Sequence, residues 1–508
     1  MNANLTKHGH ALIQKIDLFR SHINYPVAMM FVLALICSVF SAIAIVFKAV
    51  MFLVPAIMLA GTVVFFLVLK NKELFFSRSY SWLLLAIFFG SVISQLLARM
   101  SPLALQNVTD LILYTSAIGF VFAAWPYISQ SKVLCFAFLI LILMWILQLA
   151  SSLYGRSEWF SAVYQFGYNL KWPLMFISGF AIVWDRKLES KVWIVLLGFS
   201  FVLLFFTVLQ ILAPSLLNNL FSYSNNSYGG ESNPFIPLIK RLGGFYTLSS
   251  NTAAVASVGF IFLLAGWLRY RKIVFIYGIA AFGLVLICTG QRNELMALII
   301  SVVIFFLLYV QRPTWQKLLF SILGLILVGL TIYLLADKLH LDEVLRLWGI
   351  TGTLYQLTDR VALTVHGYEV AQQYFPLGAG LGTYGGVAAM KFDPSLYDDL
   401  GFARYYYWYR QGLFLMDTYW PNIYAEGGLF AAYALLLIFG LILLYSYQLK
   451  TPTIHAKAHR AAAFSILIYM LLNTISSTVI TDPKFSWMAW LSFGWAAYLS
   501  TPAIKKNI

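Results

Sequence analysis

The chain has 508 residues, of which 61% are hydrophobic and only 10% are charged. Because soluble domains carry roughly one-quarter charged residues, this composition excludes a soluble fold and predicts an integral membrane protein. Runs such as 133–150 are apolar on every face. They exclude a transmembrane barrel, whose strands alternate lipid-facing and lumen-facing residues. We therefore predict an all-α polytopic membrane protein.

The predicted membrane-spanning helices follow from apolar windows of about 20 residues, the length that crosses a bilayer. Lys171 lies inside the sixth window, where it would have to extend to the membrane surface, and Gly90 and Ser91 interrupt the third. We expect about 12 to 14 membrane-spanning helices. In chain order the windows cover residues 26–47, 50–69, 81–98, 111–128, 133–150, 165–184, 192–212, 252–268, 273–289, 295–310, 318–336, 421–446, 461–480 and 486–501.

The charge distribution predicts the orientation of these helices. With the N-terminus in the cytoplasm, most of the 34 Lys and Arg fall on the cytoplasmic side and most of the 19 Asp and Glu fall outside, as the positive-inside rule requires. The net charge of +15 is then a property of the topology, and it gives no reason to expect nucleic-acid binding. We expect both termini to be cytoplasmic, a retained first helix and no disulfide framework.

Helices and long loops divide the sequence into five parts. Long loops between helices are usually functional, so we expect the chemistry on the outer, periplasmic face. The sequence contains no P-loop pattern and no internal repeat. The parts are N-terminal helices at 1–212, an outer loop at 213–251, central helices at 252–336, a large outer loop at 337–420 before the last three helices, and C-terminal helices at 421–508.

Three arginines on the predicted outer side, Arg241, Arg292 and Arg360, stand beside turn-forming or polar residues near helix ends. A guanidinium group keeps its charge and matches phosphate oxygens with a planar pair of donors. Arginines that converge there would suit a diphosphate head group. Each arginine could instead anchor a helix end or pair with a nearby acid such as Glu294 or Asp359.

The segments around these arginines resemble motifs of the O-antigen polymerase and O-antigen ligase superfamily. The segment 241–251 contains Gly-Gly-Phe followed by Ser-Asn, and it resembles the family's Arg-x-x-Gly-x-Phe segment. The segment 289–292 is similar to the family's Thr-x-Ser-Arg motif. Arg360 followed by 374–382 is similar to the family's Arg and Pro-x-x-Gly-x-Gly stretch. Asp417-Thr418 and 426–429 align with a His-Asn pair and a Glu-x-Gly segment of ligases.

This resemblance implies a bacterial inner-membrane glycosyltransferase that acts on undecaprenyl-diphosphate-linked glycans without metal or cofactor. The glycan would pass to an acceptor hydroxyl with inversion, while Arg241, Arg292 and Arg360 stabilise the departing diphosphate. The aligned ligase histidine is Asp417 here, which favours the polysaccharide polymerase branch. Asp417 would orient or deprotonate the acceptor. It could instead cap the helix that begins near residue 421 or pair with Arg410.

The residues assigned to substrate binding lie on both outer loops. His366 is also the alternative base. The aromatic stretch 402–420 could stack on sugar rings or anchor the chain at the membrane interface. Gly380 to Gly385 matches a dinucleotide-binding pattern, but it lacks the required strand and helix context, so we interpret it as a turn. The assigned residues are Asn251, His366, Arg404, Tyr407, Trp408 and Arg410.

The expected partners are the lipid bilayer, the lipid-linked oligosaccharide and a candidate chain-length regulator, without nucleic acid. Two rival functions remain: an O-antigen ligase acting on lipid A core, and a flippase for the same lipid-linked glycan. Transporters tend to place ionisable residues at mid-membrane and to carry repeated halves, and neither feature stands out here. Polar residues 473–478 could line a cavity, or they could hold helices together.

Overall fold

The computed structural model describes residues 108–215, 232–310, 359–410, 415 and 418–500, apart from positions 183, 185, 245 and 247. These residues form helices, turns and one isolated bridge between Ser232 and Lys240, with no strand among them. The predicted all-α fold is confirmed for this part of the chain. Two compact units are present, residues 1–123 with 181–183 and residues 124–180 with 184–508. The larger unit holds every predicted functional residue.

Five helices in the described residues are long and apolar enough to cross a membrane. A sixth apolar helix, α13 (Ile273–Thr289), is shorter. By helix length and hydropathy the chain is therefore a multi-pass membrane protein. The predicted spans at 26–47, 50–69, 81–98 and 318–336 lie outside the described residues, so the total helix count stays a prediction. The five helices are α7 (Lys132–Tyr154), α10 (Arg186–Leu212), α12 (Ser249–Tyr270), α14 (Arg292–Tyr309) and α23 (Trp420–Gln448).

Two predicted spans need correction. The window 165–184 is covered by two 11-residue helices, α8 (Trp159–Asn169) and α9 (Lys171–Ala181). Pro173 has no N–H to donate to the carbonyl four residues earlier, which favours a break there. Lys171 begins α9, where it is buried with its Nζ 4.5 Å from the ring centroid of Tyr168. The window 461–480 is too long, because α24 (Ile454–Asn473) ends where the polar run 473–478 begins.

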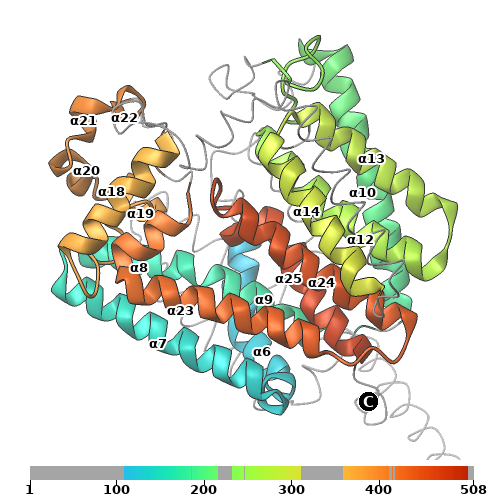
Figure 1. The fold of residues 1–508 in the computed structure, drawn as a ribbon, viewed down its shortest axis with the longest axis horizontal. Helices are drawn as coiled ribbons and strands as arrows, with labels where there is room; N and C mark the ends of the chain where they lie inside the picture. The colour runs from blue at the N-terminus through green and yellow to red at the C-terminus, as the bar shows by residue number, and fades with distance from the viewer. Residues whose placement is uncertain are drawn as a thin grey trace, which may run out of the picture. The chain divides into compact units, whose positions relative to one another are not determined.

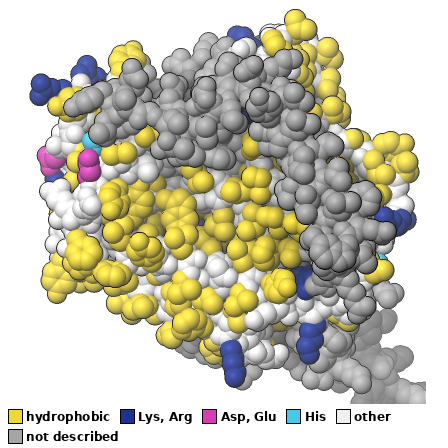
Figure 2. All heavy atoms as spheres, viewed as in Figure 1, with side chains coloured by type: hydrophobic (Ala, Val, Ile, Leu, Met, Phe, Trp, Pro, Cys, Tyr) yellow, Lys and Arg dark blue, Asp and Glu magenta, His cyan; other side chains and the backbone are white. Residues whose placement is uncertain are grey.

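Within the larger unit, the C-terminal helices hold the bundle together. The helix α24 packs against α12, α14 and α25 (Pro483–Ser500), and α23 lies along α7 (Figure 1). Small residues let the backbones approach, as at Gly494, whose Cα neighbours the Gly179 backbone. Figure 2 shows a broad hydrophobic surface over α7 and α23, with Lys and Arg at its margins. That distribution is expected of helices whose outer faces contact lipid.

Residues 359–410 form a helical cap at one end of α23. The longest helix of this cap, α18 (Asp359–Gln373), packs on α23. The core of the cap is aromatic and includes Tyr384, Tyr397 and Phe402, all fully buried. The remaining helices are short: α19 (Val387–Lys391), α20 (Ser395–Asp399), α21 (Phe402–Tyr405) and α22 (Tyr407–Arg410).

Candidate functional site

The candidate site lies at the first turn of α14. Gly290 ends α13 in the left-handed conformation at φ 66°, so the chain turns sharply and α14 starts at Arg292. The segment before α12 is bound to the same turn. Leu242 donates its N–H to the Cys288 carbonyl at 3.2 Å. Asn233 Nδ2 donates to the carbonyls of residues 287 and 288, each at 2.9 Å.

This packing brings Arg241 beside the turn that carries Arg292. A Cβ on Gly290 would lie 3.0 Å from Arg241 Cγ, closer than ordinary packing allows. Residue 290 is therefore restricted to glycine both by its φ angle and by this close approach. Arg292 itself is buried. Two of the three predicted arginines thus flank one turn, although 51 residues of chain separate them.

Arg360 approaches the same turn from the helical cap. It is the second residue of α18, and its guanidinium interacts electrostatically with the carboxylate of Glu294. Glu294 lies in the first turn of α14, two residues after Arg292. The structure therefore gathers the segments of Arg241, Arg292 and Arg360 around the N-terminus of α14.

Glu294 connects this cluster to α24. Its carboxylate is buried, and it accepts hydrogen bonds from the Tyr469 hydroxyl and from Asn473 Nδ2, the latter at 2.6 Å. A buried carboxylate needs such partners, because an unpaired charge in a low-dielectric interior is costly. The sequence analysis treated Glu294 only as a pairing partner of Arg292. Its position directly before the predicted span 295–310 was the available signal, since an acidic residue at the end of a membrane span needs a partner or water.

Asp417 lies outside the described residues, but the residues that follow it are placed. Tyr419 donates its N–H to the Thr474 carbonyl at 3.2 Å, and the Trp420 indole donates to Thr474 Oγ1 at 2.8 Å. Thr474 directly follows Asn473, the partner of Glu294. Arg410, the predicted alternative partner of Asp417, is exposed and donates through Nε to the Ala403 carbonyl.

The start of α12 is fixed beside this cluster. Gln291 Nε2 donates to Ser249 Oγ at 2.7 Å, which joins the first residues of α12 and α14. Thr252 Oγ1 donates to the Gly243 carbonyl, and Gly244 donates its N–H to Gln210 at 2.8 Å. The predicted binding residue Asn251 is half-buried in this first turn of α12. It therefore belongs with the arginine cluster.

The glycine-rich segment has a structural partner that the sequence analysis did not identify. Glu426, fully buried on α23, accepts the N–H of Tyr384 at 3.1 Å through its carboxylate and the N–H of Gly380 at 3.0 Å through its backbone carbonyl. Serines near the α7–α8 turn bind the same segment. Ser157, for example, donates to the Leu381 carbonyl at 2.8 Å. The segment 380–385 is thus a turn wrapped around a carboxylate.

His366 forms a hydrogen-bonded chain with Glu369 and Tyr406. Its Nδ1 lies 2.7 Å from Glu369 Oε2, and its Nε2 lies 2.8 Å from the Tyr406 hydroxyl. Because a carboxylate only accepts hydrogen bonds, we assign the imidazole proton to Nδ1. Nε2 then accepts from Tyr406. Burial, with a smaller effect of Glu369, raises the pKa of Tyr406, so this hydroxyl keeps its proton and remains a donor.

The other predicted binding residues lie on the cap helices near this chain. Trp408 packs on Tyr406 at a centroid distance of 5.3 Å, whereas Tyr407 is 75% exposed. Arg404 is exposed, 5.6 Å from the Tyr405 ring centroid. The cap therefore presents exposed aromatic and cationic groups beside the His366 chain, while the arginine cluster surrounds the start of α14.

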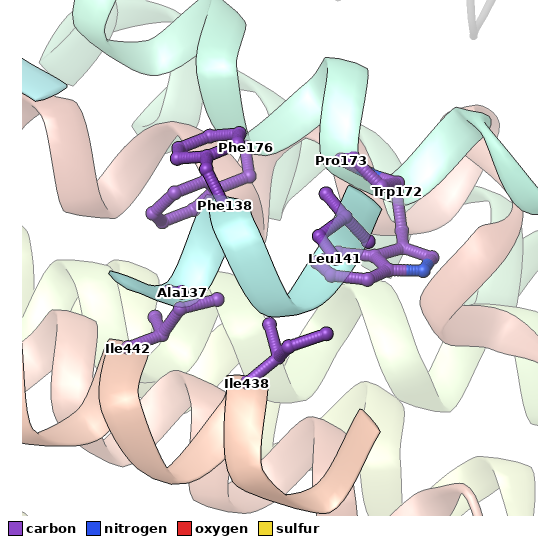
Figure 3. Close-up of a pocket in the computed structure, with 8 residues that line it drawn as sticks. All are labelled: Ala137, Phe138, Leu141, Trp172, Pro173, Phe176, Ile438 and Ile442. Atoms are coloured by element: carbon purple, nitrogen blue, oxygen red, sulfur yellow. The ribbon is translucent and has the colours of Figure 1, made fainter. Parts of the chain in front are cut away.

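A pocket between α7, α9 and α23 is a weaker site candidate. Figure 3 shows its eight lining residues, which carry no charged side chain. Phe138 and Phe176 lie on one side and Ile438 and Ile442 on the other, with Trp172 at the end. Such a lining can hold hydrocarbon, but it offers no group for acid–base or phosphate chemistry.

The fold defines the class of the protein as a multi-pass helical membrane protein, and comparisons with known proteins add no family to that class. A scan against protein-family models finds no match, and a search of curated proteins finds no relative. Among the described residues, no group of three His, Cys, Asp or Glu side chains is placed to hold a metal ion. The argument for function therefore depends on the contacts among the described residues and on the motif resemblance.

Proposed function

We propose that the protein is a glycosyltransferase whose donor is a glycan linked to a lipid diphosphate. Specifically, it is a polysaccharide polymerase that transfers an undecaprenyl-diphosphate-linked glycan to a hydroxyl of another lipid-linked repeat unit. The reaction takes place at the periplasmic face of the bacterial inner membrane. The observation that supports this proposal most directly is the meeting of the Arg241, Arg292 and Arg360 segments around the first turn of α14.

The arrangement suits a diphosphate leaving group. The N-terminus of α14 presents backbone N–H groups and the positive end of a helix dipole, which favour an anion. Guanidinium groups at the same turn add permanent charge in a site that is partly shielded from water. Glu294, held by α24, balances part of that charge through its interaction with Arg360. These groups are in place before negative charge grows on the diphosphate, so they stabilise the transition state most.

The chemical step is a displacement at the anomeric carbon. The acceptor oxygen forms a bond to that carbon while the bond to the diphosphate oxygen breaks, and its electron pair stays on the diphosphate. The acceptor proton passes to a base. Asp417 is the residue that the motif resemblance favours, and His366 is the alternative. Glu369 orients His366, and His366 Nε2 would take the proton through the Tyr406 hydroxyl, which would receive the acceptor proton as it gives up its own.

The decisive experiment replaces each arginine in a strain that makes the polysaccharide. Arg241→Ala, Arg292→Ala and Arg360→Ala should leave the protein in the membrane but abolish long glycan chains on gels. Arg271→Ala is the matched control, because Arg271 lies at the other end of α12 over the Trp267 ring. Full-length chains in all three arginine variants would refute the proposal.

The accumulated lipid-linked species separates the polymerase from its alternatives. A deletion strain of a polymerase should accumulate single repeat units in the outer leaflet. Loss of a ligase would leave finished long chains on the lipid carrier, and loss of a flippase would leave single units in the cytoplasmic leaflet. The same strain can then be tested for dependence on a chain-length regulator, the expected protein partner.

A further inference from the structure

The helix α8 has its polarity reversed relative to a helix on a soluble surface. Its polar residues Ser161, Gln165 and Asn169 are buried, whereas Trp159 and Val163 are 70% and 52% exposed. Ser161 donates to the Gly382 carbonyl at 2.8 Å, and the amide of Gln165 accepts the Ala388 N–H at 3.2 Å. The polar face of α8 is therefore used to bind the cap, and its apolar face is left on the surface.

The cap extends this apolar face. Phe392, just after α19, packs edge-on against Phe160 and Tyr164 at centroid distances of 4.9 and 5.1 Å. Beside it, Lys391 Nζ lies 3.4 Å from the Tyr164 hydroxyl. We name the surface formed by Trp159, Val163, Tyr164, Lys391 and Phe392 the α8–α19 face. It is a patch of exposed aromatic rings with a cation at its edge, and α8 and α19 are in contact (Figure 1).

The depth of the α8–α19 face relative to a bilayer follows from α7. That helix is one of the candidate spans, and its last residues Leu153 and Tyr154 are 83% and 84% exposed. The turn after α7 contains Arg156, which pairs with Asp399 of the cap at 2.6 Å. Trp159 follows within three residues. The face therefore begins where an apolar, lipid-length helix ends, at the level where Trp, Tyr and Lys residues meet phospholipid head groups.

We propose that the α8–α19 face is seated in the interfacial layer of the bilayer, where Lys391 Nζ and the Tyr164 hydroxyl together donate to the phosphate of an anionic phospholipid. The aromatic rings bury their apolar area among the upper acyl chains while the two donors stay at the head groups. Residues 387–392 of the large loop thus lie at the membrane surface. This inference does not depend on the proposed transferase function.

The first test measures depth with a fluorophore. In full-length protein with Cys37, Cys135 and Cys288 replaced by Ser, Lys391→Cys is labelled with bimane and placed in vesicles of brominated phospholipid. Tyr405→Cys, an exposed position on α21, is the matched control. We expect most of the bimane emission at position 391 to be lost in brominated lipid and little at 405. Quenching at 391 by aqueous iodide, without loss in brominated lipid, would overturn the proposal.

The second test measures the phosphate contact. Bimane attached at Val163→Cys is placed in vesicles of phosphatidylcholine mixed with brominated phosphatidylglycerol. Quenching of its emission then measures the preference of the α8–α19 face for phosphatidylglycerol. The same quenching is measured in the double variant that also carries Lys391→Gln. A lysine at an anionic surface strengthens binding by about five-fold, so the preference for phosphatidylglycerol should fall by that factor. Lys272→Gln, an exposed cation just before α13, should leave it unchanged. Equal quenching with and without Lys391 would refute the head-group contact.

Discussion

Removal of the Glu426 carboxylate should release the glycine-rich turn. The carboxylate is buried and accepts the N–H of Tyr384 at 3.1 Å. A buried donor left without its acceptor costs about 1–3 kcal/mol. We therefore expect Glu426→Ala to destabilise the local structure by about 2 kcal/mol.

Hydrogen exchange by mass spectrometry can measure this loss in full-length protein in detergent. Peptides that cover 380–386 should exchange about thirty-fold faster in Glu426→Ala, because local opening sets the exchange rate. Ser157→Ala is the matched control. It removes one hydrogen bond to the same segment, worth about 1 kcal/mol. If Glu426→Ala accelerates exchange no more than Ser157→Ala does, the carboxylate does not hold the turn and the reasoning fails.

Three further predictions address the proposed site. Gly290→Ala forces a side chain onto a residue at φ 66° and against Arg241 Cγ, so glycan polymerisation should fall sharply. Gly198→Ala is the control: open space surrounds Gly198, so this variant should not change the chain length. Tyr406→Phe and His366→Asn should each lower kcat in a purified assay with little change in KM; a change confined to KM would make both of them binding residues. Activity should survive EDTA, and a loss that zinc or magnesium reverses would contradict the metal-free mechanism.

Hydropathy predicted the helices well where apolar runs end at turn residues. The predicted span 273–289 coincides with α13, which Gly290 terminates. The prediction was wrong where a helix is interrupted inside an apolar run. The sixth window averages over Pro173 and Lys171, so a 20-residue sum cannot separate α8 from α9. The same averaging extended the last turn of α24 into residues 474–480, although turns and a short 3-10 helix occupy them.

The arginines could be predicted from the sequence, but their convergence could not. Residue type and position at predicted helix ends were enough to select Arg241, Arg292 and Arg360, because permanent cations on the outer side depart from the charge rule. Their meeting depends on contacts between segments far apart in the chain, such as the Leu242–Cys288 hydrogen bond. Periodicity contains no information on such pairings. Glu369 was missed for the same reason, and Tyr406 was predicted only as part of the aromatic stretch 402–420, without its hydrogen bond to His366.

Two buried carboxylates explain how loops of this length can present a defined site. Glu294 ties the start of α14 to α24 and faces Arg360, while Glu426 ties the glycine-rich turn to α23. A buried carboxylate without its hydrogen-bond partners raises the free energy of the folded state. Each carboxylate therefore restricts the positions of its partners more than an apolar contact would. A glycosyl transfer that relies on preorganised charge needs that restriction, because groups that must move during the reaction stabilise its transition state less. In the proposed reaction, Glu294 would thus set the position from which Arg360 acts.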